Sequence, residues 1–300
     1  MSKSAETAPS SVTANRDLPL DYSAGRQQEM LGPVAERSCI FTYHEIIPAD
    51  SRYLYRVTSS TFENHLSFIS SVRKNSSATA VPQISFDDGH CSNYENAFPM
   101  IERFGLKATF FVLAGRIGAP GAYISWGQAR EMASAGHRIE SHGWSHRILT
   151  QCSSLELDQE LSDSKREIED RLGVEVDSIS APGGRWNERV VDACVRAGYN
   201  CLFHSNPWAP VSLRKEIRVQ GRHMVTGRMD APQLQKLMRI GRVQRNYLRA
   251  RYAAKERARL VLGEQLYHKL WCWIANWNPE EGVEVEIMGR ANAGGKSKSL

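Results

Sequence analysis

At residues 84–90 the chain reads Ile84-Ser85-Phe86-Asp87-Asp88-Gly89-His90, a short apolar run that ends in two carboxylates and a glycine. Neighbouring side chains of a strand point to opposite faces, so Asp87 and Asp88 reach one site only where the chain is already turning, and Gly89 allows that turn. Catalytic groups of α/β enzymes gather at such strand ends. The same residues also suit an Asx-type turn that caps a helix, so this stretch alone leaves both interpretations open.

Short β-branched or aromatic runs alternate with helix-period segments on both sides of this stretch. Strands are predicted at residues 39–43, 83–86, 108–113, 137–140, 178–181 and 201–203. Helices are predicted between them at residues 61–72, 93–104, 126–135, 155–172 and 187–197, each opened by a polar cap or closed by a glycine. This α/β alternation favours a parallel sheet with helices on its faces, either open or closed into a barrel.

The composition is that of an ordinary globular protein, with 41% hydrophobic and 24% charged residues among 300. No stretch approaches the ~20 apolar residues of a membrane-spanning helix, and the N-terminal sequence lacks the apolar core of a secretory signal, so we expect a cytoplasmic location. We predict a flexible N-terminal arm at residues 1–36, an α/β domain at residues 37–230, a basic helical extension at residues 231–275 and a flexible tail at residues 276–300.

A second chemical motif follows the strand predicted at residues 137–140, with the sequence Ser141-His142-Gly143-Trp144-Ser145-His146. Histidines at i and i+4 can bind one metal ion, but Gly143 stands where the zincin motif needs glutamate, so no metalloprotease is indicated. Together with Asp88, the two histidines make a site of two imidazoles and one carboxylate, with open positions for water and substrate. Asp87, adjacent to such a metal, is placed to act as a base.

Several motifs in their order resemble the polysaccharide deacetylases with a NodB homology domain, also called carbohydrate esterase family 4. They are Tyr43-His44-Glu45, Ser85-Phe86-Asp87-Asp88-Gly89, Lys107-Ala108-Thr109-Phe110-Phe111-Val112, Trp126, Gly136-His137, the motif from His142 to His146, Ala181-Pro182-Gly183-Gly184 and Ala197-Gly198-Tyr199. The resemblance covers roughly residues 37–208 and implies a distorted (β/α) barrel. It also implies a metal-dependent hydrolase that removes acetyl groups, usually from N-acetylglucosamine units.

Carried over to this sequence, the resemblance makes Asp87 the catalytic base and Asp88, His142 and His146 the ligands of a divalent metal, commonly zinc. The metal lowers the pKa of a bound water, and Asp87 takes the water proton. The backbone N–H of Gly183, one residue after the proline, is the implied donor to the oxyanion. We assign the substrate-binding walls to Tyr43, His44, Pro182, Arg185 and Trp208.

The sequence departs from the family pattern at three motifs. Ser180 stands where the family has an arginine two residues before the proline, and no acid lies near Trp208 to pair with such an arginine. Because an unpaired buried charge is costly, the loss of both charges is self-consistent, and Arg185 is the remaining candidate to reach the base. The histidine that protonates the leaving amine has two candidates, His223 and His204, of which we favour His223.

The C-terminal part of the chain is strongly basic. Between residues 214 and 274 stand fifteen Lys and Arg but four Asp and Glu, whereas the whole chain has a net charge of +5. A helical appendage that packs on the barrel with a solvated basic face explains this pattern. Peripheral attachment to an anionic membrane explains it as well, because Trp271, Trp273 and Trp277 accompany the charge. No nucleic-acid reading motif is present, so we expect no nucleic-acid partner.

These observations predict a cytoplasmic, metal-dependent deacetylase that acts on N-acetylated amino sugars of a glycan or glycan precursor. An O-acetyl esterase or a non-sugar amidohydrolase with the same site is one alternative. The other is a glycan-binding or scaffold protein that has lost the chemistry, which Ser180 and the missing acid favour. Against that second alternative, the base and all three metal ligands are retained together.

Overall fold

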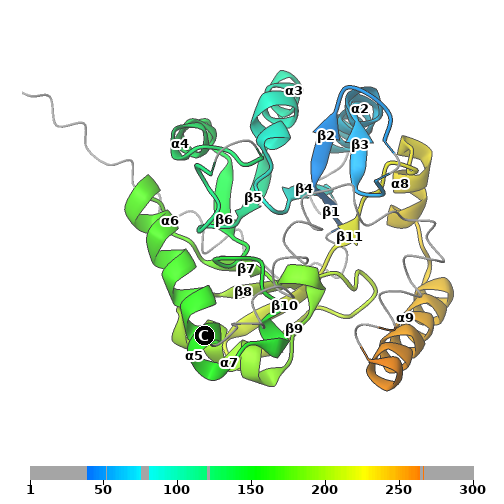
Figure 1. Cartoon of the computed structure of the whole chain (residues 1–300). Coiled ribbons are helices and arrows are strands. Elements are labelled where there is room, and N and C mark those ends of the chain that lie inside the picture. The colour runs from blue at the N-terminus through cyan, green and yellow to red at the C-terminus, as the bar shows by residue number, and fades with distance from the viewer. Residues whose placement is uncertain (1–38, 52, 76–80, 120–121, 264–265, 267–300) are drawn as a thin grey trace, which may run out of the picture. The chain divides into compact units, whose positions relative to one another are not determined.

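A nine-stranded sheet forms the centre of the fold, with strand order β11-β1-β4-β5-β6-β7-β8-β10-β9 (Figure 1). Neighbouring strands pair in parallel except β9, which runs antiparallel to β10. The strands are β1 (Ile40–Tyr43), β4 (Gln83–Phe86), β5 (Ala108–Val112), β6 (Arg138–Ser141), β7 (Ser178–Ser180), β8 (Cys201–His204), β9 (Ser212–Arg214), β10 (Ile217–Gly221) and β11 (His223–Met224). The sheet curls into a half-barrel, which confirms the predicted distorted (β/α) barrel.

The computed structural model describes residues 39–51, 53–75, 81–119, 122–263 and 266, all within the unit that spans Val34–Leu300. The predicted arm at residues 1–36 and tail at residues 276–300 lie outside the described residues, and so does the basic extension beyond residue 263 except for residue 266. Within the described ranges, none of the helices has both the length and the apolar character needed to cross a bilayer.

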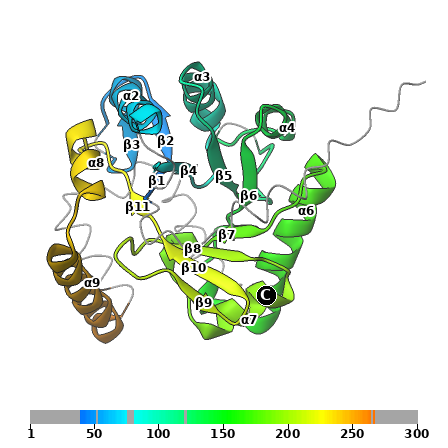
Figure 2. The same cartoon turned by 180° about the vertical axis from the view of Figure 1, so that it is seen from behind.

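Helices cover the outer face of the curled sheet (Figure 2). They are α2 (Ser59–Asn75), the π-helical turn η1 (Asn93–Ala97) with α3 (Phe98–Arg103), α4 (Trp126–Ser134), α5 (Ser154–Asp158) with the π-helical turn η3 (Gln159–Asp163) and α6 (Ser164–Leu172), and α7 (Glu188–Arg196). Each overlaps a helix predicted from the sequence. Polar caps act as expected: the Ser125 side chain accepts from the Gln128 N–H at the start of α4, and the Asn187 side chain accepts from the Val190 N–H at the start of α7.

Side chains of the strands point alternately toward the helices, where they form a core, and toward the interior of the half-barrel. Phe86 of β4 and Phe110 of β5 stack with their ring centroids 4.9 Å apart and belong to the core under the helices. Phe111, the next residue, points to the other face. It contacts Phe203 of β8 with ring centroids 5.4 Å apart. A residue's position in its strand therefore decides whether its side chain faces the helices or the interior.

Five short strands were not predicted from the sequence. Two of them, β2 (Glu45–Ile47) and β3 (Arg56–Thr58), form a small parallel sheet of their own. The other three are β9, β10 and β11, which follow β8 in the chain. Their consequence is large, because β10 pairs with β8 and β11 pairs with β1, so residues 217–224 run from β8 to the first strand.

Two further helices follow β11. Helix α8 (Ala231–Met238) starts at a capping box formed by Asp230 and Gln233 and lies beside α2. Helix α9 (Arg242–Leu262) is flanked by glycines at positions 241 and 263. Arg249 Nε donates to the carbonyl of Trp208, and the hydroxyls of Tyr252 and Ser205 lie 3.3 Å apart. The basic segment is therefore helical through residue 262 and packs against the loop after β8.

Candidate active site

A small pocket of about 90 Å³ lies at the carboxyl ends of the parallel strands. It is lined by His44, Tyr55, Asp87, His142, His146, Ala181, Gly183, Gly184, Ser205, Arg222 and Met224. His44 follows β1, Asp87 follows β4 and His142 follows β6, so separate strands each deliver a side chain. The carboxyl ends of parallel strands meet at one edge of the sheet, which brings these distant segments together.

Asp88, His142 and His146 are the group of side chains, among the residues that the structure describes, with the spacing to hold a metal ion. All three are buried, and one ligand atom from each lies within 4.8 Å of the others. Asp88 Oδ1 lies 3.3 Å from His142 Nε2 and 3.4 Å from His146 Nε2. Atoms bound at about 2.0–2.2 Å to one tetrahedral zinc ion lie about 3.3–3.5 Å from each other. The observed spacing therefore fits such an ion.

Hydrogen bonding and charge agree with that fit. Asp88 Oδ1 is buried and has no hydrogen-bond partner among the described residues, although two imidazoles face it. Burial raises the pKa of Asp88, but His142 and His146 outweigh this effect and hold the pKa well below its usual range. Burial lowers the pKa of His146 to about 4, so its imidazole is neutral at neutral pH. An ionised carboxylate and a neutral imidazole are the forms that bind metal.

The backbone at the candidate metal site is unusual. Asp88 has φ 74° and His146 has φ 70°, and Lys215 is the other non-glycine residue with positive φ in the described part of the chain. Side chains rarely adopt this left-handed conformation unless the surrounding structure holds it, and it clusters at functional sites. His142 is held differently, because its Nδ1 donates to the carbonyl of Ser180 at 2.8 Å. That bond fixes the tautomer and leaves Nε2 as the ligand atom.

Asp87 forms a buried, two-point ion pair with Arg222. Arg222 Nη1 donates to Asp87 Oδ1 at 2.9 Å and Nη2 donates to Oδ2 at 2.7 Å. The Ser180 hydroxyl donates to Oδ2 at 3.1 Å. Burial opposes ionisation of Asp87, but Arg222 and then His142 outweigh burial and hold its pKa below the ordinary value. Asp87 is therefore a fixed, ionised carboxylate, as a general base needs to be.

Arg222 is the functional residue that the sequence analysis missed, and Arg185, the predicted partner of Asp87, does not line the pocket. Ser180 leaves room for the guanidinium at the position where the family has its arginine, and its hydroxyl accepts from Arg222 Nη2 at 2.6 Å. The alternation of β10 could have identified Arg222. Val219 of β10 faces the core under the helices, and side chains alternate along a strand, so Arg222, three residues later, faces the interior.

The structure distributes the predicted substrate-binding residues differently. Of these, His44 lines the pocket, as does Gly183, the predicted oxyanion donor, whereas Pro182 is buried beside Gly183 without lining it. Tyr43 faces the helices instead, where its ring lies 5.0 Å from that of Phe62 in α2 and its hydroxyl lies 3.2 Å from His65 Nδ1. Adjacent residues of a strand point to opposite faces, so Tyr43 is a core residue on the side away from the pocket.

Neither predicted proton donor lies in the pocket. His223 contacts Trp208, with ring centroids 4.9 Å apart, and neither residue is among those that line the pocket. Arg222 and Met224, on either side of His223, do line it, so alternation turns the His223 side chain away. His204 is also buried outside the pocket, and its Nδ1 accepts a backbone hydrogen bond from residue 206.

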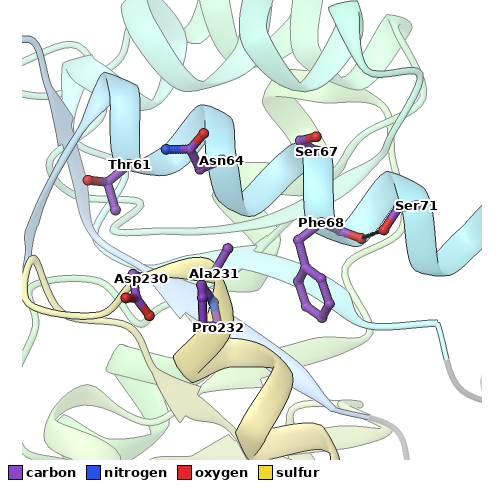
Figure 3. A pocket seen from close by; sticks show the side chains of 8 residues that line it. All are labelled: Thr61, Asn64, Ser67, Phe68, Ser71, Asp230, Ala231 and Pro232. Atoms are coloured by element: carbon purple, nitrogen blue, oxygen red, sulfur yellow. Dashed lines mark hydrogen bonds between the residues drawn. The ribbon is translucent and has the colours of Figure 1, made fainter.

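A larger pocket of about 410 Å³ lies between α2 and α8 (Figure 3). It is lined by Thr61, Asn64, Ser67, Phe68, Ser71, Asp230, Ala231 and Pro232. Its lining contains no imidazole or thiol, and its one carboxylate, Asp230, accepts from the Gln233 N–H as the cap of α8. Size alone therefore does not identify the site, and the smaller pocket holds the groups that can perform chemistry.

Fold and site together define a curled parallel barrel equipped to bind a metal ion beside a buried base. Residues 74–202 match the family described as polysaccharide deacetylase. YxkH of Bacillus subtilis (strain 168), assigned by name to the polysaccharide deacetylases, is 30% identical over 188 residues, which cover 57% of this chain and 65% of YxkH. The peptidoglycan-N-acetylglucosamine deacetylase PgdA of Listeria monocytogenes is 27% identical over 110 residues, which cover 36% of this chain and 22% of PgdA.

Solved structures show the same fold. The deacetylase PplD of Streptococcus pyogenes superposes with a TM-score of 0.61 at 22% identity, covering 68% of this chain and 99% of that chain. The polysaccharide deacetylase BC0361 of Bacillus cereus superposes with a TM-score of 0.59 at 19% identity, covering 68% of this chain and 69% of that chain. At these identities the likeness concerns the fold, while the activity of this chain rests on its own site.

Proposed function

We propose that the chain is a metal-dependent hydrolase that removes acetyl groups from N-acetylated amino sugars of a glycan or glycan precursor. One observation carries this proposal: an ionised base, Asp87, is fixed by Arg222 one residue away from Asp88 of the candidate metal site. The match of residues 74–202 to the polysaccharide deacetylase family supports the reaction class. A pocket of about 90 Å³ suits a small acyl group such as acetyl.

The chemistry divides among the residues of the pocket. A divalent ion held by Asp88, His142 and His146, which we propose to be zinc, would supply a water of lowered pKa and polarise the acetyl carbonyl. Asp87 accepts the proton of the attacking water. The N–H of Gly183, which lies in the pocket wall at φ 63°, donates to the oxyanion that forms on the acetyl group.

His44 replaces His223 as the proposed proton donor to the leaving amine. The imidazoles that line the pocket in the described chain are His44, His142 and His146, and two of them are metal-ligand candidates. His44 is buried, and its Nδ1 makes no hydrogen bond to a described residue. An amine leaves only with a proton, whereas a nitrophenolate leaves without one. We expect His44→Asn to reduce hydrolysis of an N-acetyl amide by about 10²–10⁴-fold and that of 4-nitrophenyl acetate far less.

Two results contradict this assignment of His44. One is an equal loss on amide and ester in His44→Asn. The other is a selective loss of amide hydrolysis in His223→Asn, which would return the role to the residue favoured from the sequence.

Elemental analysis of the purified protein tests the metal site. We expect about one zinc or similar ion per chain in the native protein, and its loss in both Asp88→Ala and His142→Ala. Asp170→Ala is the matched control, because Asp170 is an exposed carboxylate of α6 that does not line the pocket. A native protein that holds no metal after zinc or cobalt has been supplied contradicts the proposed function.

Two other functions remain distinct from this proposal. An O-acetyl esterase or a non-sugar amidohydrolase would use the same residues, and comparison of acetate release from amide-linked and ester-linked sugars separates them. A glycan-binding scaffold would have no need of a buried ion pair at the base. The Arg222–Asp87 pair, with exposed side-chain fractions of 2% and 4%, therefore favours an enzyme, because such a pair is costly to maintain.

Location in the cytoplasm and peripheral contact with a membrane are also proposals. Helix α9 carries seven Lys and Arg but one acid, and Val243 and Tyr247 on it are 85% and 65% exposed. Basic and apolar groups on one exposed helix suit an anionic lipid surface. Cell fractionation tests the location. For the contact, we expect vesicles with anionic lipid to retain the protein and the double variant Arg251→Glu, Arg257→Glu to lose binding, and equal retention of both proteins contradicts the contact.

A further inference from the structure

We propose that Glu160 is a positioning residue that holds His146 in the geometry needed to bind the metal, by fixing the backbone before it. This inference rests on the proposed metal site. The two histidines of that site are held in different ways. The His142 ring is anchored by the bond from its Nδ1 to the carbonyl of Ser180, whereas His146 Nδ1 is buried and has no partner among the described residues. A ligand ring without its own anchor depends on its backbone for its orientation.

Glu160 supplies that backbone anchor. Its Oε2 accepts from the N–H of Trp144 at 2.8 Å and from the N–H of Ser145 at 2.9 Å. Its Oε1 accepts from the Ser145 hydroxyl. One carboxylate therefore takes three donors from the two residues that directly precede His146. Glu160 is 5% exposed, so water does not compete for these bonds.

The helix shape explains how Glu160 reaches the loop. The run α5–η3–α6 is one helical segment interrupted by the π-helical turn η3, and such turns are frequent at functional sites. Within that turn Glu160 and the adjacent Leu161 are both buried. One turn later Ser164 lies 2.8 Å, hydroxyl to hydroxyl, from Ser141, the residue before His142. The segment therefore contacts the metal-binding loop near both of its histidines.

The opposite side of the loop is held by the turn after β5. The N–H of Ala114 donates to the carbonyl of Gly143 at 3.1 Å, and the N–H of Gly115 donates to that of Trp144 at 3.0 Å. Gly143 has φ 86°, and a Cβ there would lie 3.1 Å from Glu160 Oε2. The carbonyls of Gly143 and Trp144 face the turn after β5, and the N–H groups of Trp144 and Ser145 face Glu160. We call this two-sided arrangement of hydrogen bonds the clamp. The clamp ends one residue before the left-handed backbone of His146.

Two substitutions separate geometry from charge. Glu160→Gln keeps the length: its oxygen can accept from both N–H groups, and its NH₂ can donate to the Ser145 hydroxyl. Glu160→Asp keeps the charge but is one methylene shorter. The clamp predicts that Glu160→Asp weakens metal binding by about 10–100-fold and that Glu160→Gln stays close to native. Both are small changes in a chain whose other contacts are untouched, and Asp170→Asn is the matched control on the same helical segment.

The experiment measures the affinity of the full chain for Zn²⁺ and Co²⁺ by competition with a chelator, together with hydrogen exchange of the Trp144 and Ser145 amides. Weak binding and faster exchange in Glu160→Asp alone support the clamp. Native affinity in Glu160→Asp overturns the clamp, whether or not Glu160→Gln binds weakly. A native protein that binds neither ion overturns the proposed metal site and the clamp with it, whereas a native protein that binds with unaffected variants overturns the clamp alone.

Discussion

Replacement of Arg222 by methionine tests the pairing of the base most directly. Methionine keeps an unbranched apolar chain in the space where the guanidinium lies 4.8 Å from the centre of the Phe111 ring and 5.5 Å from that of Phe203. It removes both hydrogen bonds to Asp87, at 2.7 and 2.9 Å. It also removes the bonds from the guanidinium to the hydroxyls of Ser180 and Ser85, so the change removes the charge together with all of its hydrogen bonds and keeps the apolar contacts.

The expected shift follows from the buried geometry. Charge centres about 4 Å apart interact by about 4 kcal/mol at an effective dielectric constant of about 20. That energy corresponds to about 3 pKa units. The Ser180 hydroxyl remains at 3.1 Å from Asp87, and water can enter, so we expect the pKa of Asp87 to rise by about 1–3 units in Arg222→Met. Because Asp87 must be ionised to accept a proton, the acidic limb of the pH profile moves to higher pH by the same amount.

The assay is acetate release from oligomers of N-acetylglucosamine, with kcat/KM followed across the acidic limb. Arg214→Met is the control, since Arg214 is half exposed and lies 3.6 Å from Glu188. Ser180→Arg in the Arg222→Met background returns an arginine from the strand where the family carries it, and we expect it to move the limb back. An acidic limb that stays in place in a folded, metal-loaded Arg222→Met protein would refute the pairing argument.

Three further predictions concern stability. Burial lowers the pKa of His65 to about 4, so as the pH falls from about 6.5 the unfolded chain takes up a proton before the folded chain does. We therefore expect up to about 3 kcal/mol of stability to be lost between pH 6.5 and 4. Urea unfolding of His65→Gln should show less of this pH dependence. Gly184→Ala puts a Cβ 2.0 Å from Ser205 Oγ at φ 67°, and a drop of at least about 2 kcal/mol in the free energy of unfolding is expected; an unchanged value contradicts this close approach. Phe110→Ala removes a fully buried ring stacked on Phe86 and should cost about 3–5 kcal/mol in the same measurement, whereas a loss below 1 kcal/mol would contradict its core position.

The sequence was informative about the fold where its pattern is local. The predicted strands at residues 83–86 and 108–113 correspond to β4 and β5, because runs of apolar residues mark strands that are buried on both faces. Asp88 and the two histidines were found because they stand in two short motifs that begin where β4 and β6 end. The strands β2, β3 and β9–β11 were missed; β11, with two residues, is defined by its pairing with β1, which lies far earlier in the chain.

The residues that support the site were harder to predict for the same reason. Arg222 lies 135 positions from Asp87 in the chain, and nothing local in either segment announces the contact. Glu160 lies 15 positions from Ser145, but only the π-helical turn directs it there. His223 was favoured because it is ionisable. The strand β11 has two residues, too few to show by alternation that Arg222, and not His223, faces the pocket. The sequence therefore predicted the base and the candidate metal ligands, but not Arg222 and Glu160, which hold them in place.

The late position of Arg222 in the chain also determines when the site is completed during synthesis. Asp87, Asp88, His142 and His146 all emerge before residue 150, whereas Arg222 follows Asp87 by 135 residues. At translation rates of about 5–20 residues per second, that separation is on the order of ten seconds. A nascent chain that has made its metal-binding residues still has a base without its counter-charge. Asp87 acquires this counter-charge only when β10 and β11 dock, so the closing strands of the sheet complete the candidate site last.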